Sequence, residues 1–344
     1  MTTSTSAALA GVGSDAVSVE VTPEPIMRLA AGFMAAKHLF AANELGLFEA
    51  LDDSPTTLEG IAARTGLTPR AARISADAMV ALGLIERDGE HYRNSPTAAA
   101  FLAGQSPVDL RPVLRFWDRV SYPAWTGMAE ALASGPRTEI VELDKALQAV
   151  AAAGIEAFTA GPAAALAHTV DFGGYRRMLD VGGGTGSWSL AAVRRHDHLR
   201  ATVVELPAVA NVARERMDAS GLSARVDVVT GDAMTGELPA GHDLFLLANL
   251  IHYFSPEQNR DLLGRVRRAA DTRGRLLLAD FWTNHAHTEP VMAALMAGEF
   301  ATHVRNGDVY SVDEVCGWLP DTGWRFIEHT PLAGPISLIT ADAG

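Results

Sequence analysis

The chain has a single cysteine, Cys316, among its 344 residues, which excludes an intrachain disulfide framework and a cysteine-based zinc site. Basic residues are also scarce, because 28 Lys and Arg stand against 41 Asp and Glu, for a formal net charge of −13. Nucleic acids and anionic lipid surfaces are bound through a surplus of positive charge. The balance therefore argues against a nucleic-acid or membrane partner.

Long apolar runs are missing as well. No stretch of about 18 consecutive apolar residues appears, so we expect no membrane-spanning helix. Residues 1–22 are small and polar, without the basic start and apolar stretch of a signal peptide, and we expect a disordered tail. These features predict a cytoplasmic protein. With 48% hydrophobic and 20% charged residues, the chain has the composition of a globular protein of two or more domains.

The N-terminal part, residues 23–104, predicts a helical domain with a winged helix. Apolar residues of the segment 26–51 occupy more than one helical face, which indicates a helix buried on two sides, the second by a partner subunit. Residues 57–102 then predict two helices and a two-stranded wing that turns at Asp88-Gly89. Between residues 57 and 104 five arginines are matched by five acidic residues, so we expect dimerisation and no DNA binding.

The rest of the chain predicts an α/β protein. Residues 105–170 resemble a series of helices interrupted by prolines, and we expect this helical linker to contribute to the substrate pocket. From residue 171 to 344 short apolar runs alternate with helical segments, which is typical of a mostly parallel, Rossmann-like sheet covered on both faces. The last two runs, 324–329 and 336–340, predict an antiparallel hairpin.

A glycine-rich segment, Asp180-Val181-Gly182-Gly183-Gly184-Thr185-Gly186, ends one predicted strand and precedes a helix. Glycines let the backbone turn sharply and let a ligand approach closely. The segment lacks the third glycine of the dinucleotide fingerprint, since Ser187 stands there. It resembles instead the first motif of class I methyltransferases, which implies a seven-stranded sheet and S-adenosylmethionine as cofactor.

Two further acidic residues follow the next strands. Glu205 can accept both ribose hydroxyls, and Asp232 can accept from the adenine amino group, with Met234 over the ring. Asp180 would face the cationic amino-acid part of the cofactor, usually through water. The predicted cofactor-binding residues are Asp180, Gly182, Gly184, Gly186, Glu205, Leu206, Asp232, Ala233, Met234 and Asn249.

With these motifs and the segment Asn249-Leu250-Ile251-His252, residues 26–340 resemble the acetylserotonin/caffeate-type O-methyltransferases. The resemblance implies a homodimer, a small-molecule substrate, His252 as the catalytic base and Asp280 as the acid that orients it. A neutral imidazole suits removal of a hydroxyl proton. The family's second acidic residue is absent here, because Val309 occupies its position.

A second interpretation stays open. Glu299 and His303 are four residues apart on a predicted helix, so both can face one pocket. With His252 and Asp280 they form a set able to bind a divalent or ferric metal ion. The chain would then resemble the α-keto acid C-methyltransferases, in which a metal stabilises an enolate. O-methylation, which needs no metal, is the favoured alternative.

The predicted substrate pocket is aromatic and sulfur-rich. Its residues are Phe116, Trp117, Phe158, Met292, Met296 and Phe300. The sequence does not name the substrate.

Overall fold

The computed structural model describes residues 21–52, 54–106 and 108–344. The tail predicted over residues 1–22 therefore lies almost wholly outside the described residues.

The N-terminal part is built on one long helix, α1 (Glu24–Glu44). The remaining elements are η1 (Glu49–Leu51), α2 (Leu58–Thr65), α3 (Pro69–Ala81), β1 (Ile85–Asp88), β2 (His91–Asn94) and α4 (Pro96–Phe101). The helix predicted over residues 26–51 ends earlier than expected. Gly46, which follows the C-cap residue Leu45, adopts a φ of 68°, a left-handed conformation that stops an α-helix.

The winged helix forms as the sequence predicts. The hydroxyls of Thr57 and Thr68 accept hydrogen bonds from the first turns of α2 and α3, and Gly66 ends α2 in the left-handed conformation. Gly89 turns β1 into β2 with a φ of 60°. Local capping and turn chemistry thus explain this part of the fold.

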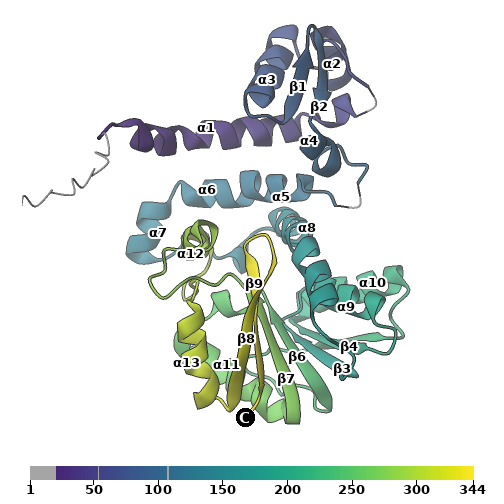
Figure 1. Ribbon diagram of the computed structural model, residues 1–344, viewed down its shortest axis with the longest axis vertical. Helices are drawn as coiled ribbons and strands as arrows, with labels where there is room; N and C mark the ends of the chain where they lie inside the picture. Colours follow the sequence, from purple (N-terminus) through teal and green to yellow (C-terminus); the bar gives the residue numbers. More distant parts are fainter. Residues whose placement is uncertain (1–20, 53, 107) are drawn as a thin grey trace, which may run out of the picture.

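Several short helices and one helix of 25 residues connect this part to the sheet. They are α5 (Arg111–Phe116), the π-helical turn η2 (Trp117–Ser121), α6 (Tyr122–Trp125), α7 (Met128–Ser134), η3 (Ile140–Glu142) and α8 (Lys145–Thr169). In Figure 1, α5 and α6 lie beneath α1, and α8 runs from them toward the sheet. The linker helices therefore stand between the winged helix and the sheet.

Among the described helices, α8 alone is long and apolar enough to cross a membrane, a property that counting consecutive apolar residues did not reveal. The same helix packs against α5 and α9, as a core helix of a globular protein does. The cytoplasmic location stays a prediction.

The C-terminal part contains a seven-stranded sheet of order β5-β4-β3-β6-β7-β9-β8. Its strands are β3 (Arg177–Val181), β4 (Arg200–Glu205), β5 (Val226–Thr230), β6 (His242–Ala248), β7 (Ala270–Asp280), β8 (Trp324–Ala333) and β9 (Ile336–Ala343). Strands β3 to β7 are parallel to one another, and β9 is antiparallel to β7 and β8. The mostly parallel sheet and its final hairpin are confirmed. The carboxyl ends of five strands consequently meet at one edge.

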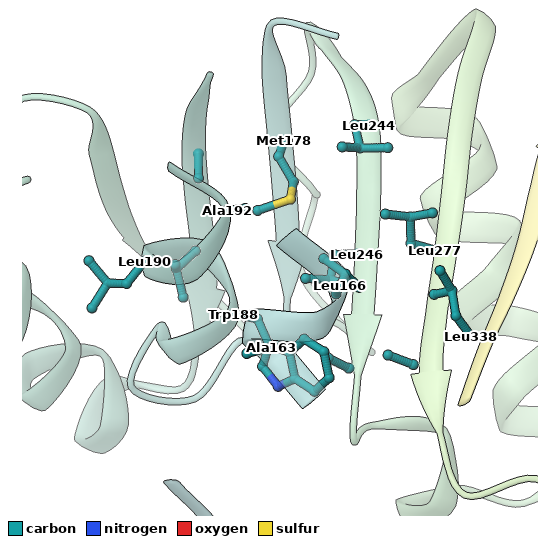
Figure 2. Close-up of a cluster of buried hydrophobic side chains, with 14 of the residues drawn as sticks. Ala163, Leu166, Met178, Trp188, Leu190, Ala192, Leu244, Leu246, Leu277 and Leu338 are labelled. Carbon is teal, nitrogen blue, oxygen red and sulfur yellow. The ribbon is translucent and has the colours of Figure 1, made fainter. Parts of the chain in front are cut away.

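Helices cover both faces of this sheet. They include α9 (Ser187–Arg195), α10 (Pro207–Ser220), α11 (Pro256–Ala269) and α13 (Val312–Asp321). The single turn η4 (Ile251–Tyr253) follows β6, and α12 (Val291–His303) packs against α6 and α7. Figure 2 shows one face, where Trp188 of α9 and Leu166 of α8 lie beside Met178 and Leu246 of the strands. Burial of each such side chain stabilises the fold by about 1.5–3 kcal/mol. This core fixes the strand ends that carry the site.

Candidate active site

The glycine-rich loop joins β3 to α9 with three left-handed residues. Gly182, Gly184 and Gly186 have φ values of 64°, 57° and 81°, which other residues adopt only with strain. A Cβ on Gly182 would approach Leu250 to 2.7 Å, so close packing also requires a glycine there. A Cβ on Gly184 would meet no described atom within 4 Å. Gly184 thus faces open space, where a ligand can approach the backbone.

Asp180 lies beneath this loop. Its side chain is fully buried, and it accepts a hydrogen bond of 2.6 Å from the Ser189 hydroxyl. Burial raises the pKa of the carboxyl to about 7, although the Ser189 bond acts in the opposite direction. Within the described part of the chain, Oδ1 has no hydrogen-bond partner. The structure therefore places Asp180 under the backbone of the loop, whereas the sequence suggested a residue facing the ligand.

The two other acidic strand-end residues bind neighbouring backbone. Glu205 accepts from the N–H groups of Gly184 and Leu206, at 2.9 and 2.7 Å. Asp232 accepts from the Met234 N–H at 2.8 Å and the Thr235 hydroxyl at 2.9 Å. The backbone also links adjacent strand ends, since the Gly231 N–H donates to the Glu205 carbonyl. These residues therefore lie at the ends of two adjacent strands, as their order in the sequence suggests. The end of β4 carries Glu205 and Leu206, and β5 is followed by Asp232, Ala233 and Met234.

Asn249 follows β6 in a left-handed conformation, with a φ of 52°. A residue other than glycine keeps this conformation only where the surrounding structure imposes it. Its side-chain oxygen is buried, with no partner in the described structure. An unpaired amide oxygen, the carboxylate of Glu205 and the open space at Gly184 fit a nucleoside-like ligand, which offers hydroxyl and amino donors.

His252 and Asp280 form a buried pair at the same edge. His252 lies on η4 after β6, Asp280 ends β7, and these strands are parallel neighbours. The distance from His252 Nδ1 to Asp280 Oδ1 is 2.7 Å. Because a carboxylate accepts, Nδ1 is the donor, and in the neutral imidazole Nε2 is then an acceptor. The Phe300 ring stacks on the imidazole at 3.8 Å and 11°, which fixes its plane.

A cavity, partly open to solvent, lies beside this pair. It brings together nine of the residues singled out in the sequence: Phe116, Trp117, Phe158, Asn249, His252, Met296, Glu299, Phe300 and His303. Met292 does not line it, and its side chain is 39% exposed. Met296, Phe300 and His303 share one face of α12, but the cavity ends before the first turn of that helix. The interpretation of Met292 as a pocket residue was wrong, because helical spacing predicts which residues share a face but not how far along the helix the cavity extends.

Several cavity residues were missed by the sequence analysis, most notably Tyr253 and Phe281. Burial, reinforced by the negative charges of Asp280, Glu205 and Glu299, raises the pKa of Tyr253 to about 12, so its hydroxyl stays a donor. Both residues directly follow a residue of the His252–Asp280 pair. That adjacency was the signal available in the sequence.

The set proposed for a metal does not assemble. Its four side chains form two pairs, His252 with Asp280 and His303 with Glu299, the latter at 3.2 Å between Nε2 and Oε1. Residues 21–344, apart from the two undescribed positions, contain no group of three or more His, Cys, Asp or Glu side chains placed to hold a metal ion. The expectation of one four-residue site is not met, because each histidine faces its own carboxylate.

Two family models match the chain. One, described as an O-methyltransferase domain, covers residues 133–325, and the other, an O-methyltransferase dimerisation domain, covers residues 27–104. The 3-hydroxy-5-methyl-1-naphthoate 3-O-methyltransferase of Streptomyces sahachiroi is 33% identical over 335 residues, which are 95% of this chain and 96% of the relative. The tetracenomycin polyketide synthesis 8-O-methyl transferase of Streptomyces glaucescens is 30% identical over 324 residues, with coverages of 92% and 95%. The solved apo structure of the S-adenosylmethionine-dependent methyltransferase SibL has a TM-score of 0.79 and 30% identity, with coverages of 94% and 99%.

Proposed function

The chain belongs to the O-methyltransferase family, and from this premise we propose that it methylates a hydroxyl group of a planar aromatic molecule with His252 as general base. The observation that carries the proposal is the His252–Asp280 pair on an aromatic cavity. Rings of Trp117, Phe158 and Phe281 follow one another along its wall, with centroids 6.3 and 6.0 Å apart. Such a wall favours a flat, apolar substrate.

S-adenosylmethionine supplies an electrophilic methyl group on a sulfonium that leaves readily, so the protein must provide position and a base. We assign its binding to the edge formed by Gly184, Glu205, Asp232 and Asn249. This edge offers the backbone of the glycine-rich loop, the carboxylates of Glu205 and Asp232, and the amide oxygen of Asn249, each at the end of a strand. Asp180 would act from beneath, by supporting the loop.

His252 Nε2 would take the proton from the substrate hydroxyl as its oxygen becomes the nucleophile. Asp280 would keep Nδ1 protonated, orient the ring and stabilise the positive charge that develops on it. The stacked Phe300 ring would hold the imidazole in place and exclude water. Asp280 lies behind His252 and is assigned a positioning role.

Two of the relatives support an aromatic hydroxyl as the acceptor. Their names specify a hydroxynaphthoate and a tetracenomycin polyketide, both methylated on oxygen. The separate His–carboxylate pairs of this chain give no comparable support to metal-assisted C-methylation.

Methyl transfer to oxygen is the first expected result. Purified protein supplied with methyl-labelled S-adenosylmethionine should convert hydroxylated naphthalenes or related phenols to methyl ethers, identified by mass spectrometry. Chelators should leave the rate unchanged, because the proposed steps use only side chains. Carbon methylation of an α-keto acid that stops with chelator and returns with added metal would contradict the proposal.

The proposal includes a homodimer formed through α1. Five large apolar residues on this helix are at least half exposed in the single chain: Ile26, Met27, Leu29, Phe33 and Met34. Apolar surface of this extent on one helix is covered in stable proteins. The position of α1 within the matched dimerisation domain supports a second copy as the cover.

Light scattering should therefore give twice the chain mass of 36.4 kDa. Phe33→Glu should yield a monomer, because a charge cannot be buried in this interface without a partner. Val212→Glu on α10 is the matched control, since both side chains are 50% exposed, and it should stay dimeric. A monomeric wild-type protein would exclude the α1 interface.

A further inference from the structure

The proposed function uses one side of the cavity and leaves two polar residues of α12 unexplained. Glu299 and His303 lie one helical turn apart, line the same cavity and are more than nine-tenths buried. Most of the remaining lining is apolar. A buried carboxylate in such surroundings is costly unless it has a purpose or full compensation.

The linker helices hold Glu299 firmly. The Ser121 hydroxyl of η2 donates to Oε1, and the Trp125 indole N–H of α6 donates to Oε2. Burial raises the pKa of the Glu299 carboxyl, but the contacts with His303, Ser121 and Trp125 outweigh it and lower the pKa overall. Glu299 is consequently a fixed negative charge in the cavity wall, and each of its oxygens keeps a lone pair that protein donors do not use.

His303 is close to this charge without being satisfied by it. Its Nε2 lies 3.2 Å from Glu299 Oε1, but the two atoms are not aligned for a hydrogen bond. No other described residue provides a partner for this buried nitrogen. Nearly all buried polar atoms in proteins find a partner in the protein, in water or in a ligand. His303 is thus in ion-pair contact with Glu299 but lacks a well-aligned hydrogen bond, and both residues line the substrate cavity, which points to a ligand as the further partner.

We propose that Glu299 and His303 form a polar subsite that binds a second hydroxyl group of the aromatic substrate. The inference rests on the proposed function. A hydroxyl can donate to the carboxylate and accept from the imidazole at once, which no acceptor-only or donor-only group can do. An anionic substituent would be repelled by Glu299. The substrate is therefore a polyhydroxylated aromatic compound, with one hydroxyl at His252 and another at the subsite.

Helix α12 places the Glu299–His303 subsite close to His252, the group that binds the hydroxyl to be methylated. Phe300, stacked on His252, is the neighbour of Glu299 in the chain and precedes His303 by three residues. His252 and the Glu299–His303 subsite therefore both face the aromatic cavity, where the rings of one substrate molecule can reach the two of them. Specificity of this kind is strong, because a substrate that lacks the hydroxyl leaves buried polar groups unpaired.

Kinetics with matched naphthalenes test the subsite. The wild-type protein should prefer at least one dihydroxynaphthalene isomer over 1-naphthol and 2-naphthol by about 10- to 100-fold in kcat/KM. Glu299→Gln and His303→Leu should lose this preference, because kcat/KM falls more for the dihydroxynaphthalene than for the naphthols. Thr302→Val is the control on the same turn, because the Thr302 hydroxyl bonds only the Glu299 carbonyl, outside the cavity lining. It should keep the preference.

A binding measurement separates the possible failures. Calorimetry without cofactor should show tighter binding of the preferred dihydroxynaphthalene than of naphthol to the wild type, and equal binding to Glu299→Gln. Variants that lose both substrates equally while thermal denaturation shows them folded would overturn the subsite and leave the proposed function intact. A metal ion that the wild type binds stoichiometrically and that His303→Leu loses would also overturn the subsite. If the wild type methylates neither the naphthols nor any dihydroxynaphthalene, the proposed function fails. Equal wild-type affinities for the two probes would overturn the subsite independently.

Discussion

Replacing His252 with alanine is expected to lower kcat for hydroxyl methylation by about 10²- to 10⁴-fold, with the affinity for S-adenosylmethionine nearly unchanged. The variant would lose Nε2, the acceptor that the Asp280 bond leaves free, while the cofactor edge at Gly184 and Glu205 stays intact. Single-turnover kinetics and calorimetry on one preparation measure both quantities. Free imidazole, which fits the space left by the side chain, should restore part of the rate.

The matched control is His242→Gln. His242 is also buried, lies on the strand that leads to His252, and bonds the Thr202 hydroxyl outside the cavity lining. This variant should retain its activity once folding is verified. Asp280→Asn should lower kcat and leave KM for the acceptor unchanged, since it perturbs only the orientation and tautomer of the base. Full activity of His252→Ala would refute the general-base assignment and leave catalysis to proximity and orientation.

Replacing Gly184 with valine is expected to weaken S-adenosylmethionine binding by at least about 100-fold. The side chain would extend into the open space in front of the loop, because no described atom lies within 4 Å of its Cβ. The backbone at this position, with a φ of 57°, would also be strained. Calorimetry with S-adenosylmethionine and its demethylated product measures the loss.

Strain and steric exclusion can be separated with Gly221→Val. Gly221 ends α10 with a φ of 72° and has equally open surroundings, but it is not part of the loop. The two variants should lose similar thermal stability, whereas only Gly184→Val should lose cofactor binding. Equal loss of binding in both would assign the effect to general destabilisation and contradict the placement of the cofactor at this loop.

The fold could be predicted because its signals are local. Caps at Thr57 and Thr68, the turn at Gly89 and the alternation of strands and helices each depend on neighbouring residues. Because the carboxyl ends of parallel strands lie at one edge, the predicted parallel sheet also placed Glu205, Asp232 and His252 on the same edge.

Other features depend on distances that sequence spacing does not contain. Met292 has the helical spacing of a pocket residue but lies beyond the end of the cavity. Glu299 and His303 share a helix face with Phe300. The hydrogen bonds that hold the Glu299 carboxylate, however, come from Ser121 and Trp125, about 180 residues earlier in the chain. The helix of residues 26–51 was predicted too long because Gly46 can also be accommodated within a helix, at a cost of about 1 kcal/mol.

The burial of Asp180 makes the folding of this protein a proton-coupled equilibrium. The folded carboxyl has a pKa of about 7, against 3.8 for an unperturbed aspartate. Between about pH 4 and pH 7 the folded chain therefore holds a proton here that the unfolded chain has released. The stability contributed by this residue is fully present below that interval and falls by up to about 1.4 kcal/mol per pH unit across it. A cation bound above the loop would favour the ionised carboxyl, so near neutral pH its binding would release this proton into the solvent.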